Sequence, residues 1–336
     1  MRKTNRYNME QLSDAVAMLR KGGLVAVPTE TVYGLAADAE NSAAIWTLFE
    51  VKQREREKAF SILVTGMDMV ERYCENIPPV AYALAEKYWP GPLTMILPKH
   101  PSIPVITSGG LDTVGVRMPS HLVARKLIEL SGVPIAAPSA NISGYPSPTT
   151  AQHVMRDMHG KIAAVVDGGD CCVGVESTVI ALEGEDSVRI LRPGYVTKEM
   201  LETVVPHVTL DKAILHQLQE GQIVRSPGMK YQHYSPHAHV TLIEGRWPEF
   251  AAWVQQHAEA GTYALVFDGE GADLSVPYLT YGTGDAEQAH QVFAKLRELD
   301  DIGAKRVFVR APNPNGIGLA VYNRLIRAAG FEVIQV

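Results

Sequence analysis

The order of hydrophobic and polar positions predicts alternating helices and strands along most of the chain. Apolar residues recur at helical spacing between Met9 and Leu19, and Gly22-Gly23 ends that helix. Short apolar runs bounded by proline, glycine or polar residues predict strands. Up to residue 205 the expected strands are 24–27, 61–65, 93–97, 113–117, 134–137, 163–167, 178–182 and 188–191, and the further helices are 43–52, 79–88, 122–130, 150–158 and 198–204.

Two regions with this alternation are separated by a stretch in which it weakens. Residues 8–205 mix helices with strands that follow one another directly, which predicts an α/β domain around a twisted mixed sheet. Residues 239–336 alternate strand, helix, strand, which predicts a small Rossmann-like parallel α/β domain. The linker between them, 206–238, contains Ser226-Pro-Gly-Met-Lys-Tyr-Gln-His-Tyr-Ser-Pro236, and its aromatic residues predict a segment that docks on the protein.

The composition is consistent with two folded α/β domains and excludes several classes of protein. With 46% hydrophobic and 20% charged residues the chain has the apolar material for a large core, so disordered and collagen-like proteins are excluded. No run approaches the ~20 apolar residues of a membrane span, and no apolar signal core follows the basic N-terminus. Three cysteines without a Cys-x-x-Cys pair suit a reducing compartment. We expect a cytoplasmic protein without a membrane partner.

The charge distribution argues against a protein built to hold nucleic acid. The net charge is −6. Residues 1–206 carry 20 basic and 23 acidic side chains and the remainder 11 and 14, so each part is −3. Neither part has the basic excess typical of nucleic-acid binding. Contact with RNA would require a local basic patch.

Early in the chain, two polar segments lie at the ends of a predicted strand and a predicted helix. Pro28-Thr-Glu-Thr-Val-Tyr-Gly-Leu35 follows a strand directly, where α/β proteins bind ligands, but a capped turn explains it equally well. Lys52-Gln-Arg-Glu-Arg-Glu-Lys58 holds four cations and two anions. Taken alone, this run favours a solvated helix end over a polyphosphate site.

Further polar residues lie within or beside apolar strands. Arg117 in Val114-Gly-Val-Arg-Met118 needs a partner if it is buried, either an anionic ligand or the carboxylate of Glu30 or Glu176. Small polar groups suited to phosphate oxygens follow the strand within 132–144. In that stretch these groups are Ser139 and Asn141. Similar polar groups lie beside apolar strands in Gly174-Val-Glu-Ser-Thr178 and Leu191-Arg-Pro-Gly194.

Several familiar catalytic signatures are missing. The chain has no Gly-x-x-x-x-Gly-Lys-Ser/Thr, no Gly-x-Gly-x-x-Gly and no Gly-x-Ser-x-Gly, which argues against P-loop enzymes, nicotinamide dehydrogenases and serine hydrolases of that type. The spacing of His233, His237 and His239 matches no common zinc pattern, so we predict no protein metal centre there.

Taken together, eight segments in this order resemble the YrdC-type threonylcarbamoyl-AMP synthases in their longer two-domain form. The segments are Pro28-Thr-Glu-Thr-Val-Tyr-Gly-Leu35, Lys52-x-Arg54, Trp89-Pro-Gly-Pro-Leu-Thr94, Gly115-Val-Arg-Met-Pro119, Ala137-Pro-Ser-Ala-Asn141, Val175-Glu-Ser-Thr178, Leu191-Arg-Pro-Gly194 and the motif 226–236. The resemblance implies a YrdC-like domain followed by the small parallel domain. It shifts the interpretation of the cationic run towards a phosphate site.

The resemblance also implies an activity and its partners. L-Threonine, bicarbonate or CO2, and ATP with Mg²⁺ would give threonylcarbamoyl-AMP and pyrophosphate, the first step of threonylcarbamoyl-adenosine formation in tRNA. A separate tRNA threonylcarbamoyl transferase complex would use the product. Because the reaction needs two anions held together, cations and hydroxyls suit it better than a strong nucleophile.

Roles follow by similarity for individual residues. Lys52 and Arg54 are the expected catalytic residues beside the phosphates. The residues expected at L-threonine are Thr31, Arg117, Ala137 and Ser177. Those expected at ATP are Arg54, Lys58, Thr113, Ser139, Asn141, Ser147, Arg192 and Tyr231. The segment that carries Tyr231 is expected to cover the site and to order on ligand binding.

One residue departs from the family pattern. Many members have proline after the arginine of Lys-x-Arg, whereas this chain has Glu55. We expect a differently shaped loop, with the added charge balanced by Arg56, and a less certain role for Lys58.

Two other functions compete with adenylate synthesis. An RNA-binding module would use a local patch around Lys52–Lys58 for a weak RNA contact, against the negative charge of both halves. A carbamoyl-phosphate-using relative would carry acylphosphatase and zinc-finger segments, which this chain lacks.

Overall fold

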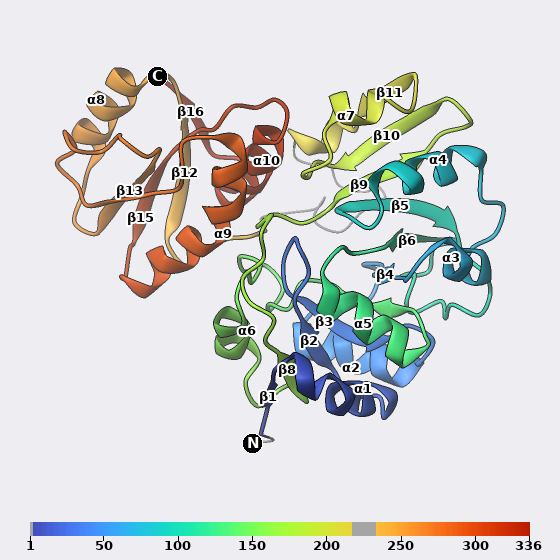
Figure 1. Ribbon diagram of the computed structural model, residues 1–336. Helices are drawn as coiled ribbons and strands as arrows, with labels where there is room; N and C mark the ends of the chain where they lie inside the picture. The colour runs from blue at the N-terminus through green and yellow to red at the C-terminus, as the bar shows by residue number, and fades with distance from the viewer. Residues whose placement is uncertain (1–2, 217–232) are drawn as a thin grey trace.

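The computed structural model describes residues 3–216 and 233–336 and arranges them in two bodies, each built on one β-sheet (Figure 1). Among the described residues the first sheet has eleven strands, in the order β1-β8-β2-β3-β7-β4-β6-β5-β9-β10-β11. Its pairs are both parallel, as in β4 with β6, and antiparallel, as in β5 with β6. The mixed sheet predicted for the first domain is confirmed.

The elements of the first body follow the chain in this order. The strands are β1 (Asn5–Tyr7), β2 (Val25–Val27), β3 (Gly34–Asp38), β4 (Ser61–Leu63), β5 (Leu93–Pro98), β6 (Thr113–Arg117), β7 (Ile135–Ala136), β8 (Ala164–Val166), β9 (Thr178–Leu182), β10 (Ser187–Arg192) and β11 (His207–Leu210). The helices are α1 (Leu12–Arg20), α2 (Ser42–Lys52), α3 (Met67–Tyr73), α4 (Pro79–Tyr88), α5 (Leu122–Ser131), α6 (Ala151–Met158) and α7 (Lys198–Glu202), with 3-10 turns at Met9–Gln11 and Lys212–Ile214.

The second body is a smaller parallel α/β unit. Its sheet order is β14-β13-β15-β12-β16, and every pair is parallel, as the sequence predicts for the last domain. The strands are β12 (His239–Glu244), β13 (Thr262–Val266), β14 (Tyr278–Thr280), β15 (Arg306–Arg310) and β16 (Val333–Gln335). The helices are α8 (Trp247–His257), α9 (Asp285–Asp301) and α10 (Gly318–Ala328).

Five elements escape the hydrophobic pattern: β1, β3, α3, β11 and β14. β3 begins inside the segment 28–35, which the pattern assigns to a loop. Its small residues are buried on both faces, so no polar alternation marks it as a strand. β11 is an exposed edge strand that pairs with β10 and adds residues from 206–238 to the first sheet. The domain limits 8–205, 206–238 and 239–336 stay a prediction.

The two bodies meet through apolar side chains. Val32 and Val175 of the first body lie in one buried cluster with Tyr234 and with Phe293 on α9. In Figure 1, α9 and α10 form the face of the second body that is turned towards the first. In the described ranges no helix is both long and apolar enough to cross a membrane.

Candidate active site

Helix α2 delivers the Lys-x-Arg motif to the interior of the first body. Asn41 caps the helix by accepting hydrogen bonds from the amides of Ala43 and Ala44. Gln53 adopts a left-handed conformation with φ of 51° and ends the helix, so the chain turns directly after Lys52. The turn places Lys52 and Arg54 on the same cavity.

Lys52 is buried and held by backbone carbonyls rather than by an acid. Its ammonium donates hydrogen bonds to the carbonyl oxygens of Ser139 and Asn141, the latter at 2.6 Å. Burial lowers the pKa of Lys52 well below its ordinary value. The solvated helix end favoured by the charge pattern is therefore wrong for this residue.

The other cations of this run have separate partners. The Arg54 guanidinium donates to the carbonyl of Ala59 at 3.1 Å and lies 5.0 Å from the centre of the Phe60 ring. Burial lowers the pKa of Arg54 to about 10. Glu55 lies 3.4 Å from the Lys58 ammonium, whereas Arg56 stacks on Trp46. The expectation that Arg56 balances Glu55 is wrong, because the aromatic ring of Trp46 holds Arg56.

Arg117 and Glu30 form a buried ion pair across the cavity wall. The Arg117 Nη2 and Glu30 Oε1 atoms are 2.6 Å apart, and both side chains are less than a tenth exposed. Arg117 also donates to the Thr31 hydroxyl at 3.0 Å and to the Gly91 carbonyl at 3.2 Å. Burial alone would raise the pKa of Glu30, but the Arg117 charge and the Ser120 amide outweigh it, and the pKa is lowered. Glu30 is thus the protein partner of Arg117.

Ser177 and Arg192 are hydrogen-bonded to each other. Arg192 donates from Nε and Nη2 to the Ser177 carbonyl at 3.1 and 3.0 Å, and from Nη2 to the Ser177 hydroxyl at 3.2 Å. The same hydroxyl pairs with Thr94 at 2.8 Å. A residue expected at L-threonine therefore adjoins one expected at ATP.

Glu176 is engaged on both carboxylate oxygens. Ser147 donates to Oε1 at 2.5 Å, and Arg324 of α10 donates to Oε2 at 2.8 Å. Burial would raise the pKa of Glu176, but the charges of Arg324 and Arg192 outweigh burial and lower it to about 2.

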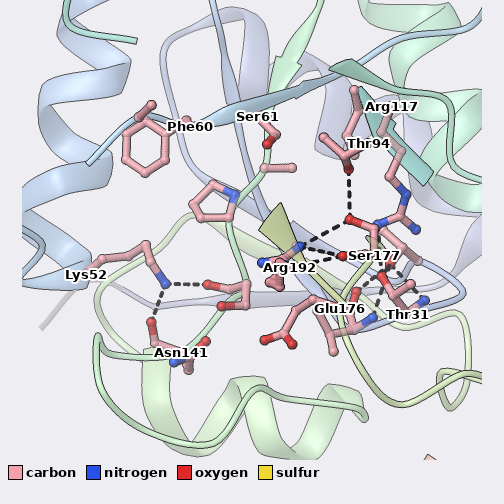
Figure 2. A pocket seen from close by; sticks show the side chains of 18 of the residues that line it. Thr31, Lys52, Phe60, Ser61, Thr94, Arg117, Asn141, Glu176, Ser177 and Arg192 are labelled. Atoms are coloured by element: carbon pink, nitrogen blue, oxygen red, sulfur yellow. Dashed lines mark hydrogen bonds between the residues drawn. The ribbon is translucent and has the colours of Figure 1, made fainter. Parts of the chain in front are cut away.

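These groups line one cavity of about 830 Å³, its open mouth included. In Figure 2, Lys52 and Asn141 lie on one side of the cavity and Arg117 and Thr31 on the other, with Arg192 and Ser177 between them. The predicted site residues that line it are Thr31, Lys52, Arg54, Arg117, Ala137, Ser139, Asn141, Ser177 and Arg192.

Four predicted residues are placed elsewhere or not described. Lys58 pairs with Glu55, and Thr113 starts β6 opposite Pro98, so neither lines the cavity. Ser147 is fully buried behind the lining and directed at Glu176. Tyr231 lies outside the described residues.

Other lining residues were not among the substrate-binding or catalytic residues predicted from the sequence. They include Thr29, Phe60, Ser61, Thr94, His233 and Tyr234. Thr94 ends the motif Trp89–Thr94, and His233 and Tyr234 belong to the motif 226–236, so the motifs contain the signal. Burial lowers the pKa of His233 to about 3, which keeps its imidazole neutral near pH 7.

The cavity favours anions although the chain is acidic. Its described lining residues include four with cationic side chains and one with a carboxylate, Glu176; the cationic ones are Lys52, Arg54, Arg117 and Arg192. Buried cations in a low-dielectric cavity attract phosphate or carboxylate groups strongly.

Metal binding by protein side chains finds no support in the part of the chain that the structure describes. No group of three or more His, Cys, Asp or Glu residues there could hold an ion. His237 contacts Asp300 and Tyr145, and His239 contacts Glu332. These histidines have protein partners.

The site is therefore an anion-binding pocket with an arginine–carboxylate pair at one end, and its lining includes residues of the central strands β4, β6 and β5 of the mixed sheet. Two family models cover the chain: that of the Sua5, YciO and YrdC proteins, described as telomere recombination, matches residues 17–194, and that of the C-terminal domain of threonylcarbamoyl-AMP synthase matches 196–330.

Individual relatives agree over nearly the full length. The threonylcarbamoyl-AMP synthases of Pyrococcus abyssi and Bacillus subtilis are 41% and 40% identical, over 96% and 98% of this chain and 95% of each relative. The crystal structure of Pyrococcus abyssi Sua5 complexed with L-threonine superposes with a TM-score of 0.92 at 39% identity and covers 99% of both chains. The chain belongs to the threonylcarbamoyl-AMP synthase family, in its long two-domain form.

Proposed function

We propose that this protein condenses L-threonine, bicarbonate or CO2, and ATP into threonylcarbamoyl-AMP and pyrophosphate. The observation that carries the proposal is the single cavity that joins the Arg117–Thr31–Ser177 group to the cations Lys52, Arg54 and Arg192. The names of full-length relatives and the L-threonine bound in the Pyrococcus abyssi structure support the same reaction.

L-Threonine is assigned to the end of the cavity at Arg117. A guanidinium has five N–H donors, and those not directed at Glu30, Thr31 and Gly91 remain for the threonine carboxylate. The Glu30 contact fixes the plane of the guanidinium, which suits bidentate binding of a carboxylate. The Ser177 and Thr94 hydroxyls lie close by for the polar groups of threonine.

ATP is assigned to the end with Lys52, Arg54 and Arg192. The neutral amine of threonine attacks CO2 and the adduct loses a proton to solvent, which leaves a carbamate anion. A carbamate oxygen then attacks the α-phosphorus as the bond to pyrophosphate breaks. Arg54 and Arg192 would offset the charge that develops on the leaving group. Lys52 would act on the backbone of Ser139 and Asn141, which border the nucleotide.

Mg²⁺ is assigned to the nucleotide rather than to the protein. Glu176, the carboxylate among the described lining residues, already accepts hydrogen bonds from Ser147 and Arg324 on its two oxygens. The described donors therefore do not fit a protein-held ion. The remaining parts of the proposal are a cytoplasmic location, a downstream tRNA threonylcarbamoyl transferase complex and weak RNA contact.

The test is pyrophosphate release from ATP and Mg²⁺, with L-threonine and bicarbonate omitted in turn. Release should require both, and Arg54→Ala and Arg117→Ala should abolish it. Arg56→Ala is the matched control, since Arg56 is exposed and stacked on Trp46. Release that ignores threonine would contradict the proposal.

A further inference from the structure

The second body forms the wall behind the segment that carries Ser177. Gly174 has φ of +86° and packs so closely on α9 that a Cβ there would lie 2.3 Å from the Ala289 carbonyl oxygen and 2.4 Å from His290 Cα. Val175 is fully buried in the cluster that contains Phe293 of α9. Segment 174–178 is therefore shaped on one side by the second body.

Arg324 of α10 contacts two segments of the first body. Its side chain is fully buried. Nε donates to Glu176 Oε2 at 2.8 Å, Nη2 to the Glu176 carbonyl at 3.3 Å, and Nη1 to the Pro193 carbonyl at 2.9 Å. One guanidinium thus joins two segments of the first body.

Both segments carry cavity residues next to these contacts. Glu176 directly precedes Ser177, and Pro193 directly follows Arg192. The segments touch, because a Cβ on Gly194 would lie 2.3 Å from the Thr178 amide nitrogen. A shift of either segment would move the Ser177–Arg192 contact, which links the two ends of the cavity.

Arg324 also offsets a negative charge that would repel a polyphosphate. Glu176 lines the cavity, and Arg324 is its ion-pair partner. Without Arg324 the carboxylate would be buried without a counter-ion beside the proposed ATP end, which is costly for the protein and for an anionic ligand.

We propose that Arg324 is a positioning residue for the active site: through Glu176 and the Pro193 carbonyl it fixes the segments that carry Ser177 and Arg192. The assignment of ligands to the two ends rests on the proposed function. It makes the second body a contributor to substrate affinity, although Arg324 does not line the cavity.

The experiment compares Arg324→Met, Arg324→Lys, Glu176→Gln and the double variant Arg324→Met/Glu176→Gln. Binding of ATP and of L-threonine is measured by calorimetry, and KM and kcat by pyrophosphate release. Arg324→Met should weaken the binding of both ligands about tenfold, which corresponds to about 1.4 kcal/mol of binding free energy. The double variant should regain part of the ATP affinity, because it removes the unpaired charge. It should stay weaker than the parent for both ligands, because it lacks the Arg324 contacts that fix the two segments.

Arg327→Met is the matched control. Arg327 lies on the same helix, is also buried and donates to the Ala213 carbonyl at 2.7 Å, not to Glu176 or Pro193. It should leave both affinities within about twofold of the parent. If Arg324→Met does not fold, Arg324→Lys and the double variant carry the same comparison, with ATP binding weaker in Arg324→Lys than in Arg327→Met.

The proposal is overturned if Arg324→Met binds both ligands like the parent, or if the double variant binds both ligands like the parent, because the loss would then come from the unpaired charge alone. Failure of the proposed function is separate. It would appear as absence of threonine-dependent pyrophosphate release in the parent protein, whereas the binding comparison does not depend on turnover.

Discussion

The two ends of the cavity hold their cations in different ways. Arg117 faces the carboxylate of Glu30 at 2.6 Å, so its positive charge is balanced within the protein. Lys52, Arg54 and Arg192 instead donate hydrogen bonds to carbonyl oxygens and, for Arg192, also to a hydroxyl. No described carboxylate forms an ion pair with these three side chains. A balanced site suits a zwitterionic amino acid, whereas unbalanced cations suit a polyphosphate. The difference supports the proposed assignment of L-threonine and ATP to opposite ends.

The largest expected effect comes from breaking the balanced end. Arg117→Met leaves Glu30 buried without its partner and should cost about 3–5 kcal/mol of unfolding free energy. Glu30→Gln added to Arg117→Met should recover most of that stability but none of the L-threonine binding. Thermal unfolding and calorimetry measure the two quantities. If Arg117→Met were as stable as the parent, the buried ion pair with Glu30 would not stabilise the fold as described.

Acid should act on Glu176, the carboxylate that Arg324 and Ser147 hold at the ATP end. Its pKa is about 2 in the folded protein against 4.5 ordinarily, so the unfolded chain binds the proton first as pH falls. The stabilisation is complete above pH 4.5 and is lost between pH 4.5 and 2. It amounts to roughly 3 kcal/mol.

Unfolding followed against pH in the parent and in Glu176→Gln isolates this contribution. The variant should show a shallower loss of stability below pH 4.5. Equal slopes for the two proteins would mean that Glu176 is not held as a carboxylate by its neighbours.

Truncation at the unbalanced end should affect ATP with little effect on folding. Arg54→Ala should weaken ATP binding by roughly 10- to 100-fold, the range for one or two hydrogen bonds to a charged group. No buried carboxylate is left behind, because the described partners of Arg54 are carbonyls. L-Threonine binding measured without ATP should change less than about twofold. An equal loss for both ligands would remove the distinction between the ends.

The smallest expected effect is the response of ligand binding to salt, which should differ between ATP and L-threonine. Raising the ionic strength from about 0.05 to 0.5 M should weaken ATP binding several-fold, because a polyanion meets uncompensated cations. L-Threonine should respond little, because the charges of both ligand and site cancel locally. Calorimetric titrations of each ligand at the two salt concentrations provide the measurement, and equal salt dependence would contradict the comparison.

The sequence predicts most of the fold because most elements have clear periodicity and turn residues. The parallel alternation after residue 239 and the strand carrying Arg117 are confirmed. Four of the missed elements have physical causes: β3 is buried on both faces, and β1, β11 and β14 are short edge strands of their sheets. Such strands lack a clear alternation of buried and exposed residues, so the hydrophobic pattern does not identify them.

Site residues were predictable where a motif places them at the end of an element. Arg54, Arg117, Ser177 and Arg192 come together as the ordered motifs suggested. The orientation of a side chain is not encoded in spacing, so Lys58 and Ser147, although within the motifs or near them, point elsewhere. Arg324 carries no local signal, since its partner Glu176 lies 148 residues earlier.

The most direct test of the two-ended cavity is a crystal structure with L-threonine and a non-hydrolysable ATP analogue bound together. The threonine carboxylate should contact Arg117, and the triphosphate should lie on Arg54 and Arg192. A triphosphate at Arg117, or a threonine carboxylate at Arg54, would contradict the account.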